Sequence, residues 1–69
     1  METLVVNVAW NEQMGKYVAV CETMTTCYSV ADTSDGAIEK FEQEYAAMLQ
    51  MFKGQIEFEF KIKRKPKVN

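Results

Sequence analysis

The side chains best suited to chemistry in this chain of 69 residues are carboxylates and two thiols, because the sequence contains no histidine. It therefore lacks the commonest general base, the usual base of a nucleophilic triad and the commonest zinc ligand. Cys21 and Cys27 do not form a C-x-x-C pair, and the glycines Gly15, Gly36 and Gly54 stand apart instead of forming a phosphate-binding loop. The sequence predicts no metal site, no cofactor site and no catalytic residue.

The carboxylates are placed for helix capping and solvation. Asp32 and Asp35 flank the expected start of a helix, where the helix dipole stabilises negative charge. Glu39, Glu42 and Glu44 lie mainly on the polar side of that helix. A metal-dependent nuclease needs several carboxylates that converge from different strands, whereas the expected core face of the sheet is apolar. We therefore expect a protein without enzymatic activity.

Size and charge favour a small binding module. A chain of 8.0 kDa buries only about 60% of its unfolded surface, which leaves no room for a deep substrate cavity. The net charge is −2, but residues 1–59 hold ten acidic and three basic residues, whereas residues 60–69 hold five basic and no acidic residues. An acidic body favours a basic protein partner over nucleic acid.

Four segments are expected to form β-strands, at residues 4–10, 17–21, 27–31 and 56–63. The first and fourth show alternation along the chain, whereas residues 17–21 are a run of β-branched and aromatic residues, and a polar connection at residues 22–26 separates them from the third strand. If the second and third strands pair with Cys21 opposite Cys27, one face of this hairpin carries Val18, Val20, Tyr28 and Val30. We expect the sheet face away from the helix to carry Val5, Ala9, Tyr17, Ala19, Cys21 and Ala31, mixed with Asn7, Ser29 and the charges of the fourth strand.

Between the third and fourth strands, residues 34–53 have the spacing of an amphipathic helix. Thr33 or Ser34 is the expected N-cap, and Gly54 is suited to end the helix. Ala47 and Met51 lie away from the apolar stripe, and a mobile thioether on a polar face is suited to contact a partner. The stripe consists of Ile38, Phe41, Tyr45, Met48, Leu49 and Phe52, with Met48 at its margin.

These elements predict an α+β fold of order β-β-β-α-β, with one helix on one face of a four-stranded sheet. A right-handed crossover through the helix makes the third and fourth strands parallel. We expect one domain over residues 1–69, with a flexible basic tail at residues 64–69. No apolar run is long enough to span a membrane and the first residues do not resemble a signal peptide, so we expect a cytoplasmic protein with reduced cysteines.

The segment from Tyr17 to Ile38 resembles the HicB family of antitoxins, whose members often read Y-V-x-x-x-P-D-L-P-G-C-x-x-x-G-D-T-x-E-E-A-L. The segment reads Tyr17-Val18-Ala19-Val20-Cys21, then Met24, Cys27, Asp32-Thr33 and Ala37-Ile38, and its spacing fits that pattern without a gap. Glu22, Thr25, Thr26 and Ala31 stand where the family tends to have Pro, Pro, Gly and Gly. The resemblance implies a truncated RNase H-like sheet without its catalytic carboxylates. The chain has no room for the DNA-binding domain that many members add, so we expect no direct DNA binding.

Three functional hypotheses follow. The resemblance implies a module that binds and neutralises a basic HicA-type toxin ribonuclease, and we expect its contacts at Glu42, Glu44, Ala47 and Met51. The first alternative is self-association into a homodimer or higher oligomer, through the bare sheet face or an edge strand. The second alternative is RNA binding through the basic tail and the neighbouring Phe58 and Phe60, although we expect these two side chains to pack in the core.

Overall fold

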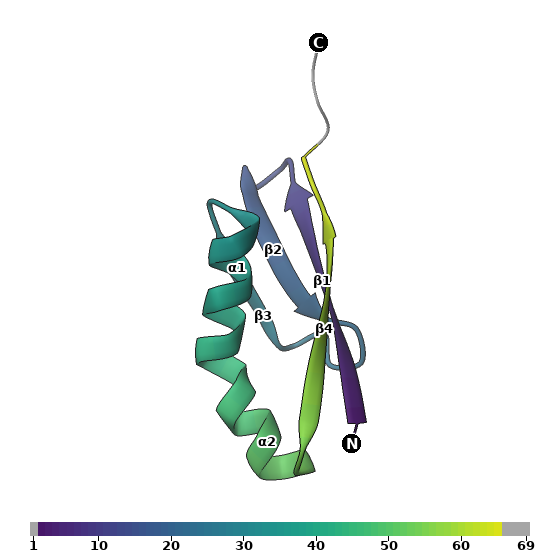
Figure 1. Ribbon diagram of the computed structural model, residues 1–69. Coiled ribbons are helices and arrows are strands. Elements are labelled where there is room, and N and C mark those ends of the chain that lie inside the picture. The colour runs from purple at the N-terminus through teal and green to yellow at the C-terminus, as the bar shows by residue number, and fades with distance from the viewer. Residues whose placement is uncertain (1, 66–69) are drawn as a thin grey trace.

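The computed structural model describes residues 2–65, and the elements follow the expected β-β-β-α-β order (Figure 1). The strands are β1 (Glu2–Asn11), β2 (Lys16–Cys21), β3 (Tyr28–Ala31) and β4 (Ile56–Lys63). One continuous helical segment lies between β3 and β4. It consists of α1 (Ser34–Phe41), the π-helical turn η1 (Glu42–Ala46) and α2 (Ala47–Lys53).

The four strands form one mixed sheet in the order β3-β2-β1-β4. Strand β1 pairs antiparallel with β2 and parallel with β4, and β2 pairs antiparallel with β3. Strands β3 and β4 therefore run in the same direction at opposite edges, and the helix crosses between them on one face (Figure 1). The hairpin register is the expected one, with Val18 opposite Val30 and Val20 opposite Tyr28. The α+β prediction is confirmed.

The two ends of the helix are set by residues that the sequence singled out. The Thr33 Oγ1 accepts a hydrogen bond from the Gly36 amide at 2.9 Å, which satisfies a free donor of the first turn. At the other end Gly54 has φ +80°, a conformation that costs little without a Cβ atom. Its amide donates to the Gln50 carbonyl at 2.9 Å, so the chain turns directly into β4.

The π-helical turn changes which side chains of the helix face the sheet. A π turn holds one more residue than an α turn, and one extra residue rotates everything after it by about 100°. Leu49 follows Phe41 by eight residues, but the extra residue of the π turn gives it the angular position of a seventh residue, which lies on the same side as Phe41. Leu49 is 3% exposed and Phe41 is 0% exposed. Phe52 is rotated off the sheet and is 82% exposed. The expectation that Phe52 belongs to the apolar stripe was wrong, whereas Met48 lies at the margin, 39% exposed.

On β2 and β3, the small side chains of Ala19, Cys21 and Ser29 face the helix, which corrects our expectation. Leu4, Val6 and Val8 of β1 are buried, and the register with β2 puts Cys21 beside Val6 and Ala19 beside Val8. The residues wrongly assigned to the far face are Tyr17, Ala19, Cys21, Ser29 and Ala31, which lie on the helix side. The reason is close packing: α1 rests directly on β2 and β3, and its Ala37 is fully buried there.

Both cysteines are part of this core. Their thiols are free and buried, and the Cys21 amide donates to the Cys27 carbonyl at 3.1 Å, as expected for opposite positions in a hairpin. On the β4 side, the fully buried Phe41 fills the space under the helix. Its ring centroid lies 5.7 Å from that of Phe58 and 6.2 Å from that of Phe60, both edge to face. These two rings are therefore held in the core, as expected, and are not a free stacking platform.

Candidate protein-binding surfaces

The C-terminal end of the helix presents apolar side chains to solvent. Met51 is 87% exposed, Phe52 is 82% exposed, and Ala47 and Met48 are also exposed. The cause lies in the lengths of the elements, because β3 has four residues whereas the helix extends over Ser34–Lys53. The helix runs past the end of β3, and α2 lies beside the beginning of β4 (Figure 1). We call Ala47, Met48, Met51 and Phe52 the helix-end patch.

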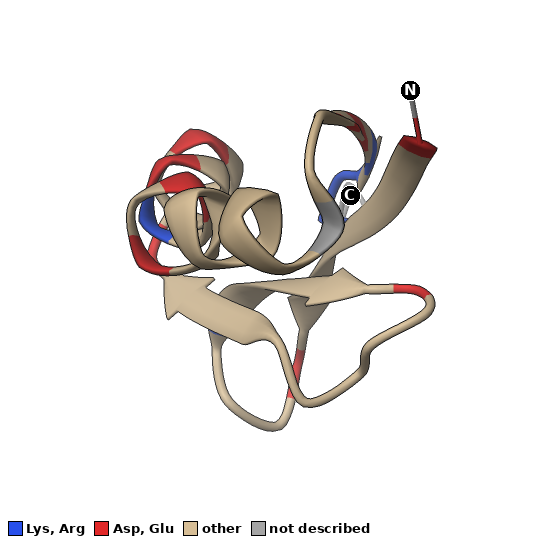
Figure 2. Ribbon diagram, turned by 90° about the horizontal axis from the view of Figure 1, so that it is seen from below, with Lys and Arg blue, Asp and Glu red and all other residues tan. Residues whose placement is uncertain are grey.

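Carboxylates precede this patch along the helix (Figure 2). Glu42 and Glu44 are exposed. The Glu44 Oε1 accepts a hydrogen bond at 3.3 Å from the hydroxyl of Ser29, a buried side chain of β3. Glu39 accepts from Gln43 Nε2 at 3.3 Å. The outer side of the helix is thus acidic in its first half and apolar in its second half.

The four residues expected to contact a partner all lie on this exposed part of the helix. Ala47 and Met51 lie four residues apart within α2, so they share one side, whereas Glu44 lies in the π-helical turn and accepts the hydrogen bond from Ser29 of β3. Glu42 lies two residues before Glu44 and points to another side. Phe52 also lies on this exposed part of the helix, although the sequence predicted it in the core. The prediction used a regular 3.6-residue period, which does not reveal the π-helical turn.

A second apolar surface covers the sheet face that the helix leaves bare, which we call the open face. Tyr28 is 53% exposed and stands opposite Val20, and Val18 stands opposite Val30. These are β-branched and aromatic side chains, larger than the small residues we expected there. With the half-buried residues of β1, the apolar part of the open face consists of Val5, Ala9, Val18, Val20, Tyr28 and Val30.

A basic and aromatic corner lies where β1 and β4 end. A shallow cavity of about 300 Å³ is lined there by Ala9, Trp10, Glu12, Lys63 and Arg64. The Lys65 Nζ lies 4.6 Å from the centroid of the indole ring of Trp10, and the Lys65 amide donates to the Tyr17 hydroxyl at 3.0 Å. The expected flexible tail therefore begins as a segment in contact with the sheet, and residues 66–69 lie outside the described residues.

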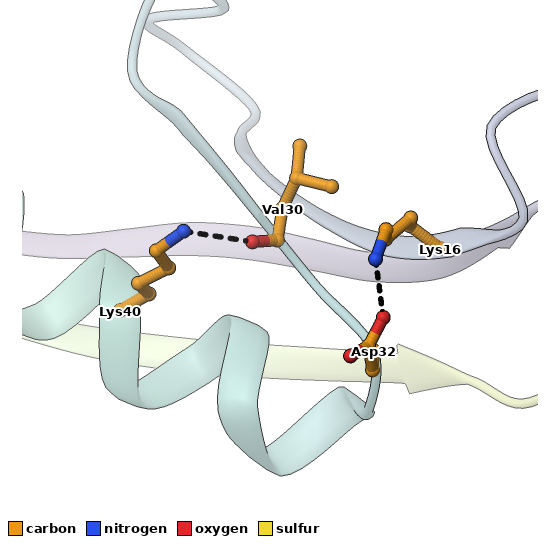
Figure 3. Close-up of polar contacts among 4 residues, drawn as sticks. All are labelled: Lys16, Val30, Asp32 and Lys40. Carbon is orange, nitrogen blue, oxygen red and sulfur yellow. Dashed lines mark hydrogen bonds and ion pairs between the residues drawn. The ribbon is translucent and has the colours of Figure 1, made fainter.

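Two lysines hold the outer end of β3 (Figure 3). The Lys40 Nζ of α1 donates to the Val30 carbonyl at 3.2 Å, and Lys16 forms an ion pair with Asp32. The hydrogen bond from the Lys16 ammonium and its positive charge hold the pKa of Asp32 below its ordinary value. Both carboxylate and ammonium are substantially exposed, so the pair fixes geometry more than it adds stability.

Within residues 2–65, no group of three or more cysteine, aspartate or glutamate side chains is placed to hold a metal ion. In the same part of the chain, no helix combines the length and the apolar character that a membrane crossing requires. No protein-family model, no curated protein and no solved structure matches the sequence or the fold at a significant level.

Proposed function

We propose that this chain is a non-catalytic protein-binding module that holds a basic protein against the helix-end patch, as a HicB-type antitoxin would hold a HicA-type toxin ribonuclease. The observation that carries the proposal is the exposure of Met51 and Phe52, at 87% and 82%, on a helix whose exposed residues before the patch include Glu39 and Glu42. Exposed apolar clusters with a polar rim are characteristic of protein interfaces.

Charge supports a basic partner. The carboxylates of Glu39, Glu42 and Glu44 line the same helix directly before the apolar patch. In protein complexes, complementary charge at the rim accelerates encounter, whereas buried apolar anchors supply most of the affinity. The two halves of the helix surface match these two roles.

The test is binding to the basic product of the neighbouring reading frame, with Met51→Glu as the decisive variant. We expect Met51→Glu to weaken the complex at least about tenfold, mostly through faster dissociation. Met14→Glu is the matched control, since Met14 is 52% exposed on the β1–β2 loop, at the other end of the molecule from α2 (Figure 1). Glu42→Lys should slow association and reduce its salt dependence.

Two results would contradict the proposal. One is a complex that keeps its affinity when both Met51 and Phe52 are replaced by glutamate. The other is that neither neighbouring gene product binds, while a single-stranded RNA oligonucleotide binds and is lost on deletion of residues 64–69. The second result would assign function to the basic corner at Trp10 instead.

A further inference from the structure

The outer edge of β4 is long and unoccupied. Strand β4 has eight residues and pairs on one side with β1, and none of the other described elements lies along its second side. An open strand edge presents a row of backbone donors and acceptors and is a template for another strand. The side chains of β4 therefore determine which strand can pair with this edge.

The charges of β4 have a symmetric order. Glu57 and Glu59 precede Phe60, and Lys61 and Lys63 follow it, all four on the open face. The ion pair between Lys16 and Asp32 involves none of these four side chains. Their neighbours on β1 are uncharged: Thr3, Val5, Asn7 and Ala9.

The charges of two β4 strands complement each other in one arrangement. If two β4 strands pair antiparallel about Phe60, Glu57 faces Lys63 of the second copy and Glu59 faces Lys61 of the second copy. Every charge on the strand then meets the opposite sign, and opposite charges at facing positions stabilise a strand pair. Parallel pairing in register places each charge beside its own kind. A two-residue shift of the antiparallel register places one charge opposite its own copy.

The other face of β4 fits the same arrangement. Phe58 would face Ile62 of the second copy, and Phe60 would face its own copy across the axis. Phe58 and Phe60 are partly buried and Ile62 is 40% exposed, so each keeps apolar surface that a second strand can cover. Both sides of the strand therefore favour one register.

We propose that two copies of this chain pair through β4, antiparallel and centred on Phe60, to form one continuous sheet with both helices on the same face. A two-fold axis perpendicular to the sheet generates this arrangement, and such closed dimers are the commonest oligomers. The proposal does not depend on the basic partner, because the helix-end patch is a separate surface.

The test uses two oppositely charged variants and sedimentation across micromolar concentrations. Lys61→Glu with Lys63→Glu makes the strand wholly acidic, and Glu57→Lys with Glu59→Lys makes it wholly basic. Each variant alone should dimerise with a Kd raised at least about tenfold, because facing charges repel. An equimolar mixture should regain dimers, each containing one copy of each variant.

Controls separate this interface from the alternatives. Asp35→Lys with Glu39→Lys changes the net charge as much as the basic variant does, on the exposed side of α1 over β2 and β3, and should leave the dimer intact. Circular dichroism verifies that each variant is folded. If either one unfolds, it is replaced by a single variant in which Glu57 and Glu59 become Lys and Lys61 and Lys63 become Glu. This variant keeps opposite charges at facing positions and should dimerise like the wild type. A wild-type chain that is monomeric throughout would overturn the proposal. So would a dimer that survives both charge variants and dissociates with Val20→Glu, since that result places the interface on the open face.

Discussion

The two edge strands of the sheet, β3 and β4, differ in length and in the side chains that contact their outer edges. Strand β3 has four residues, its Val30 carbonyl accepts a hydrogen bond from Lys40, and the ion pair of Lys16 with Asp32 closes its end (Figure 3). Strand β4 is twice as long, with eight residues, and its outer edge has no such contact among the described residues. Shortness and lysine side chains are the usual protections of an edge, and β3 is both short and contacted by a lysine of α1.

This difference determines what kind of assembly is possible. A sheet with two open edges can add copies at both sides and grow into a filament, whereas a sheet with one open edge closes after a two-fold pairing. The lysines of β4 lie on the sheet face, where they meet glutamates in the proposed dimer. One edge is thus closed, and the other is available for one specific partner strand.

The largest effect should come from Phe41→Ala, which removes the ring that holds β4 under the helix. Phe41 is fully buried against Phe58 and Phe60, so truncation should cost about 3–5 kcal/mol and leave little folded protein. The matched control is Phe52→Ala, because Phe52 is 82% exposed and should change stability by less than about 0.5 kcal/mol. Thermal unfolding measures both, and equal losses would contradict the π-helical rotation.

An intermediate effect is expected at the start of the helix, which positions Lys40 over the β3 edge. Thr33→Ala removes the acceptor of the Gly36 amide and should destabilise the protein by about 1 kcal/mol. The control is Thr26→Ala, since Thr26 is exposed in the loop before β3. Urea denaturation compares the two variants, and equal midpoints would show that the cap is not formed in solution.

The smallest effect concerns the ion pair at the end of β3. Because Lys16 lowers the pKa of Asp32 in the folded protein, the pair stabilises the fold at neutral pH, above the ordinary pKa of an aspartate. This contribution is lost as the pH falls through the lowered pKa. The stability difference between the wild type and Asp32→Asn should therefore shrink on acidification. A difference that grows at low pH would have the wrong sign for this pair.

Much of this architecture follows from periodicity. The change of period at Gly54 placed the helix and β4 correctly, because a spacing of 3.6 and a spacing of 2 bury different residues. The register of β2 and β3 followed from setting Cys21 opposite Cys27. The N-cap was predicted to be Thr33 or Ser34, and the structure assigns it to Thr33.

Two features were not predictable in this way, and both affect the candidate surfaces. The two faces of the β2–β3 hairpin are both apolar, so alternation alone does not tell which of them a helix covers. The close approach of α1 selects Ala19 and Cys21 and leaves Val18 and Val20 on the open face. The exposure of Phe52 depends on one extra residue in a helical turn, which no apolar spacing marks.

The contrast between the two edges is tested most directly by hydrogen exchange of the backbone amides at several protein concentrations. We expect the outer amides of β4 to exchange more slowly as the concentration rises, while those of β3 keep the same rate. Slower exchange at β3 or across the open face, with no change in β4, would contradict the account.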